Sequence, residues 1–485
     1  MIDPTLPTRP PAPDHYTQKR WEHSSLRRRM LIGDWSEDLN QEMRRHFSSS
    51  RRAIIGIEDM SSNIFKSICN NLNALYTESP SVGVIEGVPG EAASFLGANG
   101  YISRAGLWPI MQHVAFFTLG LRECFLKIDI HKGELVYIPV TPDFVYASSP
   151  PGRPMDPDYI AHLQLRMKKG DPIWTYDIFD LRDLTNPSYK IVEVEKNGDF
   201  GEDVSDLFLG APLEGESYPY RFADGSPFLP FTLYHAQLLG NKLFDPFYNS
   251  ELVAGSLTSA CLHTFALHMA KNTAYPQRYI LGAFLDGASI QDADGTSRRA
   301  TIPTDPASIL VFSPDLEMQG QPMIGQFNAG GDPGALMDMI VSYERKLASS
   351  SGGVNPASVQ KLSGDPRSGY AIAMSKSDLR ASQRTLKPPM EKGDLKTLEL
   401  SAAMCNRFLG TSFPETGYRI EYQTIPLSKE EMEAIRKDTI EKEQAGYITK
   451  IDAVKVFNPD FSDQEAAEYL REVRRQQIEF NVSTI

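Results

Sequence analysis

The chain has 485 residues, a mass of 54.1 kDa and a formal net charge of −13, with 41% hydrophobic and 23% charged residues. This composition predicts a globular protein of a few domains with a sizeable core. The acidic total argues against a protein that coats nucleic acid by bulk electrostatic attraction, although it allows one that lets nucleic acid pass without adhering.

The N-terminal residues predict an extended arm followed by a charged helix. Five prolines lie before Asp14, without the apolar segment of a signal peptide, and residues 1–20 are interpreted as an arm. Trp21 to Arg45 is charged and compatible with a helix. Its run of three arginines, Arg27 to Arg29, is interpreted as a solvated face.

The next two hundred residues predict helices and then an antiparallel sheet. Helical spacing of apolar residues predicts helices at 57–76 and 107–121, with a Gly/Ala-rich loop at 87–100 between them. From Glu123 to Tyr234 the period changes to two, which indicates half-buried strands in one β-rich domain. A later strand, at 418–423, is expected to return to that sheet.

A long helix at 252–270 has no Asp, Glu, Lys or Arg over 19 residues. It is long enough to cross a membrane. However, it is dotted with Ser, Thr and His and lacks close aromatic belts, so packing between protein neighbours is the preferred interpretation. The core helix of a monomeric domain stays open as the alternative. A β-rich insert at 275–327 and a second helix at 333–348 follow.

A loop rich in Gly, Ser, Asn and Pro occupies residues 349–368. Its only cations are Lys361 and Arg367, opposed by Asp365. Such a loop suits a flexible, weakly basic constriction, and it suits an ordinary surface loop equally well.

The third long helix, at 369–410, carries a basic stripe and a proline pair. Pro388 and Pro389 predict a bend or a break, because proline lacks the amide hydrogen and clashes with the preceding turn. The stripe has spacings of four, four and three, which place it on one helix face. It would face DNA phosphates or, as we slightly prefer for so acidic a chain, carboxylates of a neighbouring subunit. Its members are Lys376, Arg380, Arg384 and Lys387.

Three capping-box patterns in series predict a small C-terminal helical domain. They begin at Ser428, Thr449 and Ser462, each with an acidic residue three positions later. Gly446 and Asn458-Pro459 supply the stops between the helices.

Familiar catalytic motifs are absent from the sequence. It has no phosphate-binding P-loop, no GxGxxG after a strand, no HExxH and no GxSxG. The four cysteines are isolated, which favours buried thiols, and His263 and His268 are spaced as core or interface residues rather than metal ligands. Asp332 before Pro333 is explained as a helix N-cap. We therefore expect no catalytic residue, no metal and no cofactor.

The order of elements resembles the portal proteins of tailed double-stranded DNA bacteriophages. The run 445–453, with Asn458-Pro459 and 462–465, resembles the crown helices of that family. The run 368–372 resembles the start of its tunnel helix. The resemblance covers roughly residues 50–480 as an order of elements.

The resemblance implies an α+β, portal-like fold. In it a β-rich wing, long stem helices, a small α/β clip, a kinked tunnel helix and a helical crown follow one another. The implied parts are arm 1–20, wing 21–246 (β-rich at 123–234), stem helices 247–272 and 331–348, clip 273–330, tunnel loop 349–368, tunnel helix 369–410, wing return strand 411–427 and crown 428–485.

The resemblance also implies a structural role without catalysis. Family members form a ring, usually of twelve copies, at one capsid vertex of the virion after assembly in the host cytoplasm. This head-tail connector conducts double-stranded DNA non-specifically during genome packaging and ejection. It binds the large terminase ATPase, then a head-completion adaptor and tail proteins, and it contacts the major capsid or scaffolding protein; no membrane is involved. Two alternatives stay open: a phage capsid or tail assembly protein without a channel and, less favoured, a hydrolase with paired carboxylates in the β-rich domain.

Overall fold

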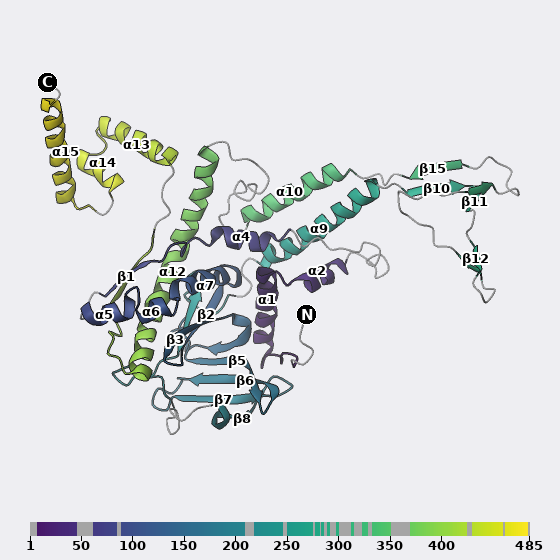
Figure 1. Ribbon diagram of the computed structural model, residues 1–485, viewed down its shortest axis with the longest axis horizontal. Helices are drawn as coiled ribbons and strands as arrows, with labels where there is room; N and C mark the ends of the chain where they lie inside the picture. The colour runs from purple at the N-terminus through teal and green to yellow at the C-terminus, as the bar shows by residue number, and fades with distance from the viewer. Residues whose placement is uncertain are drawn as a thin grey trace.

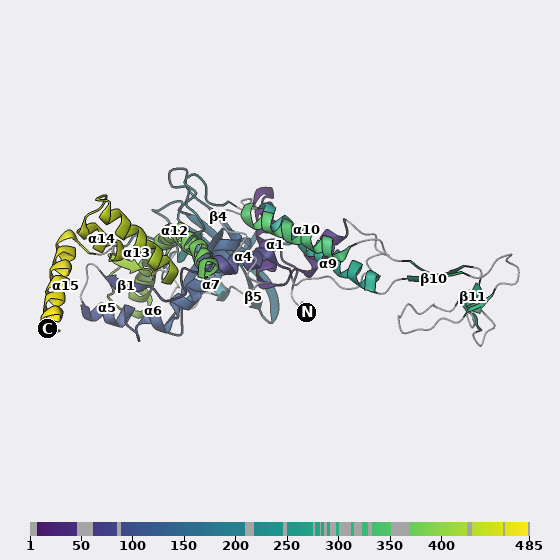
Figure 2. The same cartoon turned by 90° about the horizontal axis from the view of Figure 1, so that it is seen from above.

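A computed structural model describes residues 7–45, 62–84, 89–208, 218–245, 250–274, 277–281, 283–285, 289–291, 297–299, 312–314, 323–327, 332–350, 369–423, 429–458 and 461–483. The fold is 51% helical and 20% strand, which confirms the α+β class. Figure 1 shows a central body with a helical hairpin reaching out on one side and a group of short helices on the other. Seen from above, the molecule is thin in the third direction (Figure 2).

The N-terminal part is helical and begins earlier than predicted. The arm ends at Asp14 rather than at residue 20, because the Asp14 carboxylate accepts the amide hydrogen of Thr17 at 2.9 Å and caps the first helix. The predicted loop at 87–100 contains a helix, and the predicted helix at 57–76 is shorter in the described residues, where Asn63 caps a helix that ends at Leu72. The helices are α1 (His15–Ile32), α2 (Ser36–Met43), α4 (Ile64–Leu72), α5 (Pro89–Leu96), α6 (Tyr101–Arg104) and α7 (Leu107–Leu121).

The β-rich region forms two antiparallel sheets instead of the single predicted sheet. The first has the order β3-β2-β9, with β2 (Glu123–His131), β3 (Glu134–Val140) and β9 (Phe231–His235). The second has the order β4-β5-β6-β7-β8, with β4 (Val145–Ser148), β5 (Tyr159–Lys168), β6 (Asp171–Asp180), β7 (Ser188–Val194) and β8 (Phe200–Asp203). Short helices η1 (Pro142–Phe144) and α8 (Ser205–Phe208) accompany the second sheet.

The prediction for the late strand is wrong. β16 (Tyr418–Glu421) pairs antiparallel with β1 (Ser81–Val84), with Val82 opposite Ile420, and joins neither larger sheet. Two-stranded pairing satisfies its backbone groups, and alternation alone does not specify which partner a strand takes.

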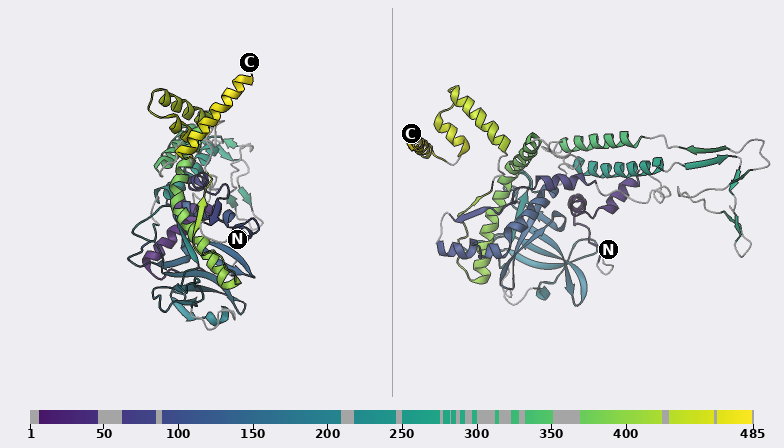
Figure 3. Two further views of the ribbon diagram at one scale, coloured as in Figure 1. Left: turned by 90° about the vertical axis from the view of Figure 1, so that its left-hand side faces the viewer. Right: turned by 45° about the horizontal axis from the view of Figure 1, so that its top comes forward.

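The uncharged helix and its successor form a hairpin. α9 (Ser250–Ala274) and α10 (Pro333–Ser350) lie side by side and point away from the body, with a β insert at the far end (Figure 3). Gly255 permits their close approach, because a Cβ there would lie 2.5 Å from Leu347 Cδ1. The insert contains β10 (Gln277–Leu281), β11 (Ala283–Leu285), β12 (Ser289–Gln291), β13 (Ser297–Arg299), β14 (Phe312–Pro314) and β15 (Met323–Phe327).

α12 (Gly369–Leu409) crosses the body as one helix of 41 residues (Figure 1). Pro388 and Pro389 lie inside it, so of the predicted bend or break the break does not occur, and the bend stays a prediction. Pro388 deprives the carbonyl of Arg384 of its helical donor, and both residues are exposed, so water can reach that carbonyl.

The C-terminal group contains α13 (Lys429–Gln444), α14 (Lys450–Phe457) and α15 (Asp463–Ser483). The capping boxes at Thr449 and Ser462 are confirmed by reciprocal hydrogen bonds. The group is loosely packed: a hollow of about 410 Å³ lies among its helices, lined by Val454, Phe457 and Leu470. Among its described side chains, only Thr439 and Ala466 are buried.

Candidate nucleic-acid interface and the seat of α12

The basic stripe of α12 is only partly on the outer surface. Arg384 and Lys387 are exposed and Arg380 is partly exposed. The Lys387 ammonium lies 5.7 Å from the ring centroid of Tyr422, a cation–π contact within the same chain. Of the three stripe residues whose side chains the structure describes, Arg384 is thus the one most available to a phosphate or a neighbouring carboxylate.

Several predicted site residues lie outside the described residues. These are the three charged residues of the 349–368 loop and, as far as its side chain is concerned, one stripe residue within α12. They are Lys361, Asp365, Arg367 and Lys376.

The outward direction of Arg384 follows from how the opposite side of α12 is held. Ser382 Oγ donates to the carbonyl of Leu72 at 3.2 Å, and Gln383 Nε2 donates to the carbonyl of Gln423 at 2.7 Å. Leu386 and Met390 are buried on the same side. Because the four residues span two turns on one helix face, the cationic face is left toward solvent.

The strongest polar attachment of α12 is Asp394, which is 1% exposed. Three tyrosine hydroxyls donate to its carboxyl: Tyr76 to Oδ2 at 2.7 Å, Tyr422 to Oδ2 at 2.5 Å and Tyr234 to Oδ1 at 3.1 Å. The three tyrosines come from the turn after α4, the segment after β16 and strand β9. We call Asp394 and these three tyrosines the seat of α12.

A second layer of hydrogen bonds extends the seat into the three-stranded sheet. The hydroxyls of Tyr234 and Thr397 are 2.7 Å apart, and Thr397 Oγ1 donates to Thr232 Oγ1 at 2.9 Å. Further along α12, the hydroxyls of Ser401 and Tyr137 are 2.8 Å apart. α12 is therefore fixed to the body by a continuous line of buried polar contacts in addition to apolar packing.

Burial controls the charge of the seat. Removal from water raises the pKa of Asp394 to about 7, although the hydroxyls of Tyr422, Tyr76 and Tyr234 favour the ionised form and oppose the shift. Burial also raises the pKa of Tyr76 and Tyr234 well above 10, so these phenols stay protonated.

The interpretation of the arginine run as a solvated face is wrong. Within the run, Arg27 is buried and Arg28 and Arg29 are only partly exposed, and Arg20 on the same helix is buried as well. Arg20 donates to the carbonyl oxygen of Pro142 at 3.1 Å and to that of Val145. Arg27 donates to the carbonyl of Gly120 at 3.2 Å. Burial lowers the pKa of both arginines to about 10, which leaves them charged at neutral pH.

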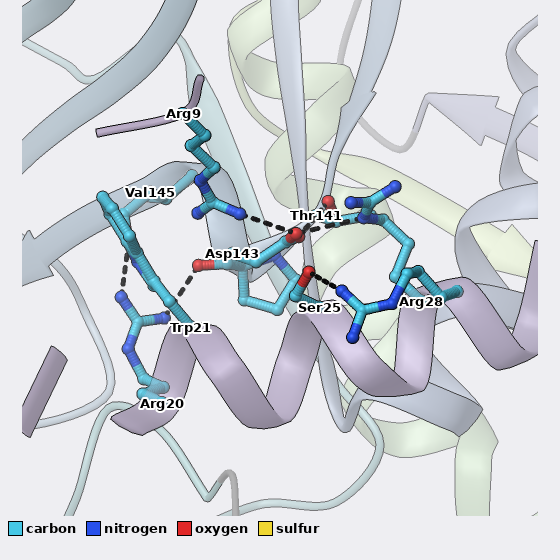
Figure 4. Close-up of polar contacts among 10 residues, drawn as sticks. Arg9, Arg20, Trp21, Ser25, Arg28, Thr141, Asp143 and Val145 are labelled. Carbon is cyan, nitrogen blue, oxygen red and sulfur yellow. Dashed lines mark hydrogen bonds and ion pairs between the residues drawn. The ribbon is translucent and has the colours of Figure 1, made fainter. Parts of the chain in front are cut away.

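Asp143 forms ion pairs with two further arginines of this region, Arg9 and Arg28. Figure 4 shows Arg9 and Arg28 reaching its carboxyl from two sides. The distances to Asp143 Oδ2 are 3.2 Å from Arg9 Nη1 and 3.0 Å from Arg28 Nε, and Thr141 donates to the other oxygen. Arg9 also lies 4.6 Å from the ring centroid of Trp21. The cluster fastens the N-terminal arm and α1 to the sheets, which is a structural role.

A polar cluster around Glu344 joins the two helices of the hairpin. Oε1 of Glu344 on α10 accepts from Ser259 on α9 at 2.7 Å and from Ser62 at 3.0 Å, and lies 2.9 Å from His263 Nε2. Burial would raise the pKa of Glu344, but these three partners outweigh it and lower that pKa. The expectation that His263 is a satisfied interface histidine is confirmed.

Potential metal ligands are dispersed in the described part of the fold. Within the described ranges, no group of three or more His, Cys, Asp or Glu side chains is placed to hold a metal ion. All four cysteines are buried free thiols, as predicted. Residues 250–270 of α9 are long and apolar enough for a membrane span, and 56% of the most apolar 18-residue window within them is buried in the fold.

Sequence reasoning missed Asp394, because it looks like any of 62 acidic residues. Its three partners lie 318, 160 and 28 positions away in the chain, and no local motif marks such a group. No protein-family model matches the chain, and no curated protein matches it significantly in sequence.

Proposed function

We propose that the protein is a ring-forming portal protein, which conducts double-stranded DNA through one capsid vertex during genome packaging and ejection. In this role it docks the packaging motor and later the head-completion and tail proteins, and it performs no catalysis. The ring would contain about twelve copies, as the family resemblance implies.

The α9–α10 hairpin carries the proposal. It projects from the body (Figure 3), and on α10 the described side chains that are buried are only Ile340, Leu347 and Ala348. Leu267 is 56% exposed and Met339 is 50% exposed, although α9 has no charge over residues 252–270. A hairpin whose apolar side chains, such as Leu267 and Met339, are left uncovered by the described part of the chain is suited to burial by another protein surface. Copies arranged about an axis would supply that surface on both sides.

The shape and charge of the body support the same function. A flat subunit (Figure 2) fits as one sector of a ring. The net charge of −13 would make the wall of the channel repel DNA. Because each phosphate that a Lys or Arg neutralises adds affinity and salt dependence, a wall with few such contacts would adhere only weakly to DNA. Arg384 on the outer face of α12 remains a contact for DNA or for a carboxylate of the next subunit.

Native mass measurement and negative-stain imaging of the purified full chain test the proposal. We expect closed rings with an axial hole wide enough for a DNA duplex. A monomer at high protein concentration would overturn the proposal, and shells or tubes without an axial hole would favour an assembly protein that lacks a channel.

A matched pair of variants ties the result to the hairpin. Met339→Glu places a charge on the exposed face of α10, and we expect it to weaken the ring. Met167→Glu is the control, because Met167 is 61% exposed on β5, away from the hairpin. Equal effects of both substitutions would exclude the hairpin as the subunit contact.

A further inference from the structure

We propose that Asp394 is a proton switch in the seat of α12, neutral and tightly packed below neutral pH and charged and more loosely packed above it. The inference rests on the hydrogen bonds of the seat and holds whether or not the chain forms a ring. It concerns how firmly one long helix is held to the body.

The seat can hold Asp394 in both protonation states, and the protonated state has one hydrogen bond more, between Tyr234 and Thr397. When the carboxylate is ionised, all three tyrosine hydroxyls donate to it. When it is protonated, Oδ1 can donate its proton to the Tyr234 oxygen. Tyr234 can then donate to Thr397, 2.7 Å away, because either oxygen of that pair can be the donor. Thr397 already donates onward to Thr232.

The arrangement around Oδ2 is different, because this oxygen accepts from both Tyr76 and Tyr422. A proton on Oδ2 would compete with both of these hydroxyls, for which the described contacts offer as an alternative only the bond from Tyr76 to the Tyr422 oxygen. A proton on Oδ1 disturbs neither hydroxyl, so we assign it there, and the switch runs through Tyr234 and the threonines.

The charges that face the carboxyl can be named for each packed element. Tyr76 faces it from the turn after α4, Tyr234 from β9, and Tyr422 from the segment after β16. On α12 itself, the negative charge of Glu391 disfavours ionisation of Asp394 and so raises its pKa. Lys387 is the nearby cation, positioned over the ring of Tyr422. Since the phenols stay protonated, Asp394 is the member of the seat that titrates near neutrality.

The direction of the effect follows from proton linkage. The folded pKa of Asp394, about 7, lies above the 3.8 of a free aspartate, so the folded state binds the proton more tightly. The stabilisation from that proton is fully present below about pH 4 and is lost as the pH rises through about 7. Ionisation leaves a negative charge in a site closed to water, which loosens the seat.

Infrared difference spectroscopy of the full chain tests the protonation state directly. The carbonyl stretch of a protonated carboxylic acid disappears on ionisation, and ¹³C-aspartate labelling identifies it as aspartate. We expect the wild type to lose one aspartic acid band with a midpoint near neutral pH, and Asp394→Asn to lack that band. Absence of an aspartate band in the wild type above about pH 5 would overturn the proposal.

Glu123 provides a matched control, because among the described residues it is another buried carboxyl whose pKa is raised by burial to about 7. Glu123→Gln should leave the aspartate band in place. Tyr422→Phe removes one donor to the ionised carboxylate while keeping the ring, so it should move the midpoint upward. An unchanged midpoint in Tyr422→Phe, against a surface control Tyr447→Phe, would contradict the assigned hydrogen bond.

Hydrogen exchange of α12 measures the mechanical consequence. After correction for intrinsic exchange, amides at 390–398 should exchange several-fold faster above neutral pH than below it in the wild type. In Asp394→Asn this pH dependence should vanish. If the wild-type protection of α12 is the same on both sides of neutrality, the carboxyl does not act as a switch.

Discussion

The main chain of Gly393 lies against the ring of Tyr234: a Cβ on Gly393 would be 2.4 Å from Tyr234 Cε1. This contact lets α12 approach β9 closely enough for the hydroxyl of Tyr234 to reach Asp394. A side chain of any size at this position must push the helix and the strand apart.

Gly393→Ala should therefore destabilise the protein, even though alanine is favoured over glycine inside a helix by about 1 kcal/mol. Overpacking costs about 1–3 kcal/mol or more, and we expect a net loss in the free energy of unfolding from urea denaturation. Gly152→Ala is the control, because no atom lies within 4 Å of a Cβ there. Equal stability of the two variants would show that α12 does not need this close approach.

Asp143→Asn should cost about 3 kcal/mol of stability, because it removes a fully buried carboxylate and leaves Arg9 and Arg28 uncompensated. Limited proteolysis should also cut the arm before α1 more readily. The exposed pair Asp180–Arg182 provides the control, since Asp180→Asn should cost about 0–1 kcal/mol. If Asp143→Asn lowers the free energy of unfolding by no more than Asp180→Asn does, the cluster does not contribute to stability.

Arg20→Lys should lower the free energy of unfolding by about 1–3 kcal/mol. A lysine ammonium cannot reproduce the planar fork that serves the carbonyls of Pro142 and Val145 while resting on the Phe244 ring, 3.8 Å away. Chemical denaturation is the measurement. Arg44→Lys, at an exposed position after α2, should be neutral, and a neutral Arg20→Lys would contradict the importance of the fork.

Glu344→Gln should loosen the hairpin at neutral pH by about 1–2 kcal/mol, measured by hydrogen exchange in α9 and α10. The folded pKa of Glu344 is depressed, so its contribution is present above the unfolded value and is lost as the pH falls through the folded pKa. The difference between wild type and variant should therefore shrink in acid. A difference that stays constant down to acidic pH would show that the carboxylate charge is not what holds the two helices.

Thr449→Ala should reduce the protection of α14 by about 1 kcal/mol, because it removes one half of the capping box. α14 has no buried side chain to compensate. Thr449→Ser retains the hydroxyl and should keep most of the protection. Loss of protection in both variants would point to the methyl group of Thr449 instead of the cap.

Local signals account for what the sequence predicts well. α7 matches the predicted helix at 107–121, and the capping boxes at Thr449 and Ser462 begin helices as expected. Asp332 accepts the amide hydrogen of Gly334 at 2.8 Å, as an N-cap should. Each of these features depends on residues a few positions apart.

Long-range pairing accounts for what the sequence does not predict. Alternation marks residues 418–421 as a strand, but its partner is β1, more than three hundred positions earlier. The buried arginines of α1 look like surface charges until η1, β4 and α7 bring carbonyl acceptors to them. The seat of α12 needs four distant segments to meet, and no pattern in any one of them reveals it.

The hollow beside Phe457 has a thermal consequence. Helices that border an open hollow and bury only Thr439 and Ala466 among their described side chains gain little packing enthalpy from one another. In the isolated chain, α13 to α15 should therefore melt separately from the body and appear as a low-temperature shoulder in the calorimetric trace.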